Sequence, residues 1–377
     1  MLVIGAVLTT IAGCETIGYY RQAIGGQLAV TLARQPVAKV LANPETEASL
    51  RDRLQSSQDM LEYLERKVGL PSEGRYRSYV ALDRDAVVYN LVATPAFSVS
   101  ANQWCYPIAG CAPYRGYFSR QRAQRAAERY QGRGFTTYIG AVPAYSTLGW
   151  FADPLLSTFV GWNDARLMTL LAHELSHSKV WVASDVAFNE AFATFVGEQT
   201  TRNWLSASNP GLLQEHAWRQ VQWRRLTGLV LTLKGYLERL YAQPERDADQ
   251  SQQTDAAYRE FRRCYQQHRT LLGDGRFDAY VAGLNNAALA ALATYRTSVP
   301  AFAALYAQSD EHWDAFFAAA QALAAQSAPE RASQLARLRE QGLGLVQEQP
   351  AQAGDHEHAN QVQCQALAHH GVDGHMP

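Results

Sequence analysis

The sequence predicts an α+β protein that is predominantly helical, in which a small mixed sheet precedes a large C-terminal helical region. Apolar residues recur at helical spacing before residue 70, and almost every segment after residue 164 has the same periodicity. Between these regions, β-branched and aromatic runs at 79–82, 87–93 and 136–142 are typical of strands. The chain has 377 residues, of which 47% are hydrophobic, so it can bury a substantial core.

The composition excludes several classes of protein. Only 18% of the residues are charged, and 8 Trp, 19 Tyr and 13 Phe supply large apolar side chains, so the chain is not intrinsically disordered. The formal net charge is -1, which offers no electrostatic basis for binding nucleic acid. The sequence contains no internal repeat, and we expect a monomer.

Two helices are expected first, at 24–43 and 45–68. The second has Pro44 at its start, apolar residues at helical spacing and an end near Gly69. Within the strand region, the Arg- and Ala-rich segment 119–130 favours a helix. In the C-terminal region, breaks between helices are expected at Asn209-Pro210, Asp274-Gly275, Val299-Pro300 and Ser327 to Pro329.

The N-terminus carries a short apolar run, Leu2 to Ala12, which ends in small residues before Cys14. A bilayer-spanning helix needs about 20 apolar residues, whereas this run has the length of the hydrophobic region of a secretory signal. Ile11 to Cys14 resemble the bacterial lipobox, although no Lys or Arg precedes them. The resemblance implies cleavage before Cys14, acylation of Cys14 and a lipid-anchored protein of the bacterial cell envelope that faces the periplasm. The alternative is a buried apolar segment with an incidental cysteine.

The other four cysteines form an even set, as is common in exported proteins with disulfides. Cys105 and Cys111 flank a turn-rich loop that a local disulfide could close. Cys264 and Cys364 are a second candidate pair, but sequence alone does not establish the distance between them. No spacing of Cys and His indicates a zinc ribbon.

The most informative motif is the HExxH segment from His173 to His177. On a helix, residues four apart project from one face, so both imidazoles can bind one zinc ion. Glu174 lies beside His173 and can reach a metal-bound water as a general base. Asn163-Asp164 supplies an N-cap for this helix, and its leucines supply a buried stripe. The alternative is an ordinary helix with a chance match to the motif.

A catalytic zinc ion takes three protein ligands and leaves one position open, so a third ligand is required. Glu190 lies 13 positions after His177, which on one straight helix would place it about 20 Å away. The chain must therefore reverse, and Ser184 or Asp185 can cap a second, returning helix that carries Glu190. Asp185 is the alternative third ligand, although capping suits it better.

Several blocks of the sequence together resemble the bacterial zinc aminopeptidase lipoproteins, a gluzincin-type family with HExxH and a downstream glutamate. These blocks are 105–111, 114–118, 144–151, 153–157, 173–198 and 284–302. The resemblance covers roughly residues 14 to 330. It implies a zincin-like fold, one zinc ion at His173, His177 and Glu190, and Glu174 as the catalytic base. At Gly197-Glu198 this sequence departs from the family pattern, in which the acidic residue comes one position earlier.

The chain is accordingly divided into five segments. Residues 1–13 are expected to be a lipoprotein signal peptide, and residues 14–76 an N-terminal helical segment. The zincin-like catalytic core covers 77–205, and 206–345 is a helical region that completes the same domain. Residues 346–377 hold five of the ten histidines and many glutamines, and we expect them to form a disordered tail.

The function expected from these features is zinc-dependent peptide hydrolysis, most specifically aminopeptidase activity, with a zinc-activated water and Glu174 as general base. Tyr145 and Tyr295 are candidates for the hydroxyl that stabilises the oxyanion, and each could equally be a buried aromatic residue. An aminopeptidase also needs an acidic group for the substrate's free amine, for which Glu198 is the candidate. Two alternatives stay open: an endopeptidase or another envelope amidase, and a non-catalytic envelope lipoprotein with a structural zinc site.

Overall fold

The computed structural model describes residues 2–106, 110–144, 152–244 and 247–347. The side chains of residues 2–15, 247, 346 and 347 are outside this description, as are Tyr145, Cys364 and the expected tail from residue 348. Within the described residues, no helix combines the length and the apolar character needed to cross a membrane.

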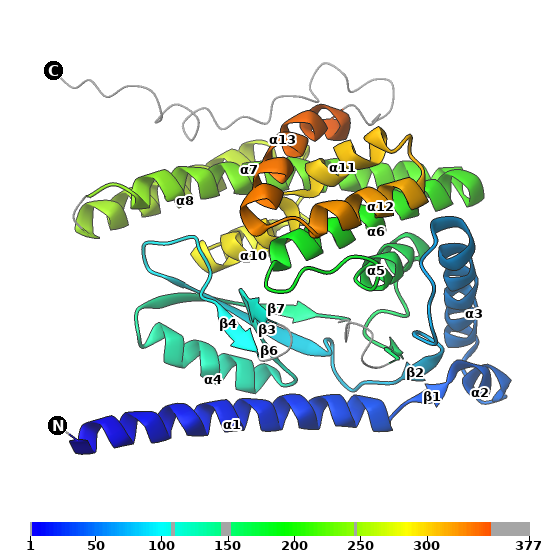
Figure 1. Cartoon of the computed structure of the whole chain (residues 1–377), viewed down its shortest axis with the longest axis horizontal. Coiled ribbons are helices and arrows are strands. Elements are labelled where there is room, and N and C mark those ends of the chain that lie inside the picture. Colours follow the sequence, from blue (N-terminus) through cyan, green and yellow to red (C-terminus); the bar gives the residue numbers. More distant parts are fainter. Residues whose placement is uncertain (1, 107–109, 145–151, 245–246, 348–377) are drawn as a thin grey trace.

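The N-terminal region differs from the prediction of one helix at 24–43, because the helix is interrupted after Leu32. A single helix, α1 (Leu2–Leu32), runs along one edge of the molecule and is followed by strand β1 (Gln35–Pro36) and the short helix α2 (Val37–Ala42) (Figure 1). Pro36 explains the break, because it lacks an N–H and its backbone is extended, with φ -54° and ψ 132°. A residue that precedes proline is also disfavoured in the helical conformation.

The second predicted helix has nearly the expected extent. Helix α3 (Ala48–Tyr63) continues into a π-helical turn, η1 (Leu64–Val68). Gly69 ends it with a left-handed φ of 76°, a conformation that glycine adopts without steric cost. Leu54, Leu61 and Leu64 are fully buried, so this segment contributes its apolar face to the main core.

The central sheet has the strand order β6-β3-β7 and is antiparallel. Strands β3 (Val88–Pro95) and β7 (Phe135–Val142) pair over their full length, which confirms the strands predicted at 87–93 and 136–142. Strand β6 (Arg115–Tyr117) forms one edge. Helix α4 (Arg120–Gln131), close to the predicted 119–130, packs its alanines on one face of the sheet. Because side chains alternate along a strand, Val88 and Asn90 point to the opposite face, which lines a cavity.

Two smaller sheets complete the β-structure of the described residues. Strand β2 (Ser78–Val80) pairs antiparallel with β1 and parallel with β8 (Leu155–Leu156). Strands β4 (Trp104–Tyr106) and β5 (Gly110–Ala112) pair with each other, and Cys105 and Cys111 lie opposite one another. These two cysteines form a disulfide.

The C-terminal region is helical, as predicted, and the overall fold is therefore α+β and predominantly helical. Its helices are α5 (Asp164–Ser176), α6 (Val186–Ser208), α7 (Pro210–Tyr241), α8 (Asp247–Gln267), α9 (Asp278–Ala282), α10 (Asn286–Arg296), α11 (Val299–Gln308), α12 (Trp313–Ala324) and α13 (Ala328–Gln347). The predicted breaks lie between helices or at the start of the next helix, and Pro210 starts α7 at a position where its missing N–H costs nothing. In Figure 1 the central sheet lies between α4 and this helical layer.

The main core joins the returning helix α6 to the C-terminal helices. Phe192 of α6 is fully buried and contacts the rings of Phe302, Phe316 and Phe317, with centroid distances of 5.6, 5.8 and 6.2 Å. Burying one such side chain stabilises the fold by about 1.5–3 kcal/mol. Helix α6 is therefore held on both sides, since it also packs closely on α5.

Candidate metal centre

The HExxH segment spans the last turn of α5 and the residue that follows it, His177, which is the C-cap of the helix. The Asn163 side chain caps the start of this helix by accepting a hydrogen bond from the backbone N–H of Arg166 at 2.9 Å. One face of this helix is fully buried through Leu167, Leu171 and Leu175. The burial of this face determines which side of the helix points towards the cavity. This orientation brings the rings of His173 and His177 to the same side, with their centroids 5.0 Å apart.

The chain then reverses, as the position of Glu190 requires. Ser184 adopts a left-handed φ of 65°, and Asp185 caps α6 by accepting a hydrogen bond from the N–H of Phe188 at 3.1 Å. Asn189 stabilises the reversal through two hydrogen bonds to Val182, both of 2.8 Å. Its side-chain oxygen accepts one from the N–H of Val182, and its side-chain N–H donates the other to the carbonyl of Val182. Asn189 was not among the residues expected from the sequence, because its role depends on a contact seven residues away.

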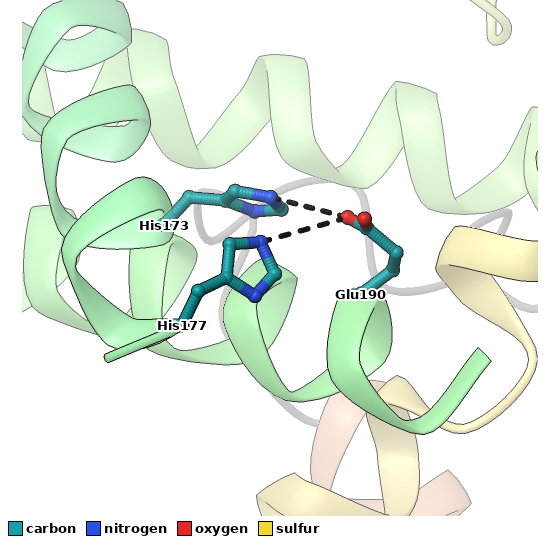
Figure 2. Close-up of side chains that lie close together, drawn as sticks. All are labelled: His173, His177 and Glu190. Atoms are coloured by element: carbon teal, nitrogen blue, oxygen red, sulfur yellow. Dashed lines mark ion pairs between the residues drawn. The ribbon is translucent and has the colours of Figure 1, made fainter. Parts of the chain in front are cut away.

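This reversal places Glu190 opposite the two histidines (Figure 2). Its Oε2 lies 3.3 Å from Nε2 of His173 and 3.9 Å from Nε2 of His177. One ligand atom from each of the three residues lies within 4.8 Å of the other two, and the group could hold a metal ion. Two ligands of a tetrahedral metal ion at about 2.0 Å would lie about 3.3 Å apart, which matches the distance between Glu190 and His173, whereas the distance from Glu190 to His177 is longer.

The protonation of the three residues also fits metal binding. Burial lowers the pKa of His177 to about 4, so its imidazole is neutral at pH 7. Burial alone would raise the pKa of Glu190, but the hydrogen bond from His173 and the electrostatic interaction with the two histidines lower it. Burial likewise opposes a charge on His173, but the same hydrogen bond and the two nearby glutamates raise its pKa. A metal ion would displace the proton that His173 shares with Glu190.

Glu174 is buried next to this group and lines the same cavity. Burial raises the pKa of its carboxyl to about 7; His173 opposes this shift, whereas Glu190 and Asp153 add to it. A carboxyl with a pKa near neutrality can both accept and return a proton, which is the requirement for a general base.

The cavity has a volume of about 970 Å³ and lies between the sheet and the helical layer. Its lining includes Tyr295 of α10 and also Tyr114, which was not among the functional residues expected from the sequence. Burial raises the pKa of both phenols, and the charges of Glu190 and Glu174 act in the same direction. Both hydroxyls therefore stay protonated and can donate a hydrogen bond near Glu174 and Glu190. The other candidate, Tyr145, lies outside the described residues.

Two acidic candidates have other partners. Asp185 caps α6 and also pairs with Arg331, whose Nη2 lies 2.9 Å from its Oδ2. Glu198 pairs with Arg296 at 2.5 Å and is not part of the cavity lining. Neither residue is placed among the metal ligands.

The paired strands β4 and β5 contact the reversal between α5 and α6. The N–H of Cys111 donates to Oγ of Ser184 at 3.2 Å. Gly110 lies so close to Ser184 that a Cβ at position 110 would be 2.3 Å from Oγ of Ser184. The disulfide pair therefore lies directly against the segment that orients Glu190.

Comparison with known proteins gives one family. The model of a family described as "Putative aminopeptidase" matches residues 18–335, which include α5, α6 and the cavity. No curated protein and no solved structure matches the chain.

Proposed function

Because the chain belongs to this aminopeptidase family, we propose that it is a zinc-dependent peptide hydrolase whose active site is the cavity beside His173, His177 and Glu190. The observation that carries the proposal is the convergence of these three ligand atoms next to a buried carboxyl, Glu174. Such a combination supplies a metal site together with a general base.

The residues of the chain have distinct roles in this reaction. Zinc at the three ligands would lower the pKa of water and polarise the peptide carbonyl. Glu174 accepts a proton from the water that attacks the carbonyl carbon, and it returns this proton to the amine when the C–N bond breaks. Tyr295 donates its O–H to the oxyanion that forms between these two steps.

A structural zinc site is the alternative in a different class, and the geometry disfavours it. A structural site is closed by a fourth protein ligand. The nearest sequence candidate, Asp185, accepts a hydrogen bond from Phe188 and pairs with Arg331 instead. The described residues offer three ligands, so one position stays open for water or substrate.

Attachment to a membrane of the bacterial envelope through Cys14 belongs to the same proposal. The outer face of α1 supports it: of the seven large hydrophobic side chains exposed in the described part of the chain, five lie on this helix. They are Ile17, Tyr20, Ile24, Leu28 and Leu32, at helical spacing. The opposite face packs on the protein through Gln22, which bonds to the backbone of Gly116 and Phe118. An apolar stripe next to the acylated residue would lie against the bilayer surface.

Metal analysis and peptide hydrolysis test the proposal together. Wild-type protein should contain about one zinc ion per chain and cleave peptides from a panel of short substrates. Glu174→Gln should keep the zinc and lose about 100-fold or more of the hydrolysis rate. Glu62→Gln, an exposed glutamate that pairs with Arg66, is the matched control and should behave as wild type. A zinc-loaded wild type that cleaves no peptide would contradict the proposal.

A further inference from the structure

One end of the cavity is strongly basic, although the whole chain has a net charge of -1. Four arginines from separate parts of the chain line it, and we call them the arginine cluster: Arg166, Arg219, Arg276 and Arg296. They come from the first turn of α5, from α7, from the segment before α9 and from the end of α10. Among the described residues that line the cavity, the only carboxylates are Glu174 and Glu190.

Nearby acids neutralise only part of this charge. Arg219 pairs with Glu215 at 2.6 Å and Arg296 pairs with Glu198 at 2.5 Å. Arg166 and Arg276 have no ion pair with any described carboxylate, and Arg276 donates instead to Oε1 of Gln222 at 3.0 Å. Partial burial lowers the pKa of Arg166 and that of Arg276, and the positive charge of Arg219 lowers both further. The cluster therefore lacks counter-charge at two of its four positions.

Three members of the cluster are held by aromatic rings that also line the cavity. The guanidinium of Arg166 lies 3.9 Å from the ring centroid of Trp162, that of Arg276 lies 4.6 Å from Phe277, and that of Arg296 lies 5.5 Å from Trp223. A guanidinium on a ring is restrained, while its N–H groups remain available along the edge. This is the arrangement that suits bidentate binding of a carboxylate.

The charge of the cavity has a consequence for the substrate. A free amine would be repelled by the cluster, and the two glutamates in the lining are committed to the metal and to proton transfer. We propose that the arginine cluster binds a carboxylate of the peptide, so that the enzyme prefers short peptides that have a free C-terminus or an acidic side chain. This inference rests on the proposed peptide hydrolysis and specifies its substrate class.

Matched peptides test the inference and distinguish the two sources of the carboxylate. Ala-Ala-Ala is compared with its C-terminal amide, and Ala-Glu-Ala amide is compared with Ala-Gln-Ala amide. In wild-type protein at least one of the peptides that carry a carboxylate should exceed its partner without the carboxylate in kcat/KM by about tenfold or more. The preference should decrease at high salt, because the cluster is partly exposed.

Variants of the cluster provide the second comparison. The double variant Arg166→Gln/Arg276→Gln should remove the preference mainly through KM. Arg133→Gln is the matched control, since Arg133 also lies over aromatic rings, those of Tyr130 and Phe135, but is not part of the cavity lining. Equal kcat/KM in wild type for the peptides with and without the carboxylate, or a preference that persists in the double variant, would overturn the inference.

Binding separates this inference from the proposed function. Zinc-loaded Glu174→Gln is titrated calorimetrically with Ala-Ala-Ala and with its amide, so that no turnover is needed. Tighter binding of the free acid, lost in the added double variant, would support the cluster even if wild type hydrolysed neither peptide. The opposite result is that wild type hydrolyses both peptides equally and Glu174→Gln binds both equally. That result would support the proposed peptide hydrolysis and would contradict carboxylate binding by the arginine cluster.

Discussion

Glu190 is the residue on which the charge balance of the metal centre depends. Its carboxylate faces both histidines, and its pKa is lowered by them, so it is ionised at neutral pH. The two positive charges of a zinc ion would be balanced by the carboxylates of Glu190 and Glu174. A buried group of charges with no net charge costs less to desolvate than an unbalanced one. The carboxylate of Glu174 would therefore help to balance the charge of the metal in addition to accepting a proton.

Tyr295 is the residue for which the structure makes the sharpest catalytic prediction. Tyr295→Phe removes only the hydroxyl and should lower kcat about 100-fold, because one donor to the oxyanion is lost, while zinc content is unchanged. Steady-state kinetics with metal analysis measures both quantities. Tyr306→Phe is the control, since that hydroxyl accepts a hydrogen bond from Asn203 and does not line the cavity. An unchanged kcat in Tyr295→Phe would exclude this role.

At the residue scale, sequence alone identified the three residues that could hold a metal ion, because helical spacing is a local property. His173 and His177 are four apart, and a cap at Asp185 was enough to return Glu190 towards them. Tyr114 could not be found in the same way, because it reaches the glutamates only through the tertiary fold. The arginine cluster was missed for the same reason, since its members are spread over more than one helix and loop.

At the element scale, the segment between α5 and α6 determines where Glu190 lies. Asn189 holds it from one side through two hydrogen bonds to Val182. The disulfide-linked strands β4 and β5 contact it from the other side, at Ser184. Groups that orient a metal ligand commonly affect affinity by 10- to 100-fold, so we expect these contacts to matter for zinc binding.

Gly110 tests the contact between the β4–β5 pair and the metal site. Gly110→Ala should destabilise the protein by about 1–3 kcal/mol and weaken zinc binding, because its φ is 76° and its Cβ would meet Ser184. Urea unfolding and zinc titration measure the two effects. Gly134→Ala is a close control: its φ is 80°, but a Cβ there would meet nothing within 4 Å. Equal zinc affinity in the two variants would show that the contact does not position Glu190.

Most elements of the fold could be predicted because their signals lie within a few residues. Caps, proline positions and β-branched runs marked α5, α6, β3 and β7 close to their observed bounds. The predicted helix 24–43 was wrong, because the apolar periodicity outweighed Pro36. The short strands β1, β4, β5, β6 and β8 were not predicted, since strands of two or three residues depend on their partners rather than on their own sequence.

At the scale of the whole molecule, the cavity is assembled from segments far apart in the chain. The cavity is lined by Tyr19 and Ala23 of α1, by the face of the sheet opposite α4, and by residues of α5, α6, α7 and α10. Helix α1 is thus both a wall of the cavity and, in our proposal, the part nearest to the membrane (Figure 1). The substrate cavity would then open close to the bilayer surface.

Membrane attachment makes a prediction at this scale. In a bacterial host that processes lipoproteins, wild-type protein should sediment with membranes, whereas Cys14→Ala should be largely released, because acylation provides the stable anchor. Fractionation followed by immunoblotting measures the distribution. Gly18→Ala on the same helix, where an added Cβ would meet nothing within 4 Å, serves as the control and should stay with the membranes. Retention of Cys14→Ala with the membrane fraction would contradict a lipid anchor at this residue.

The central claim is a zinc centre at His173, His177 and Glu190, and anomalous diffraction at the zinc absorption edge tests it most directly. Crystals of the zinc-loaded protein should show one strong peak about 2.0–2.2 Å from Nε2 of both histidines and from a carboxylate oxygen of Glu190. In His177→Ala the peak should be lost or greatly reduced. A peak at other residues, or none between these three side chains, would contradict the account.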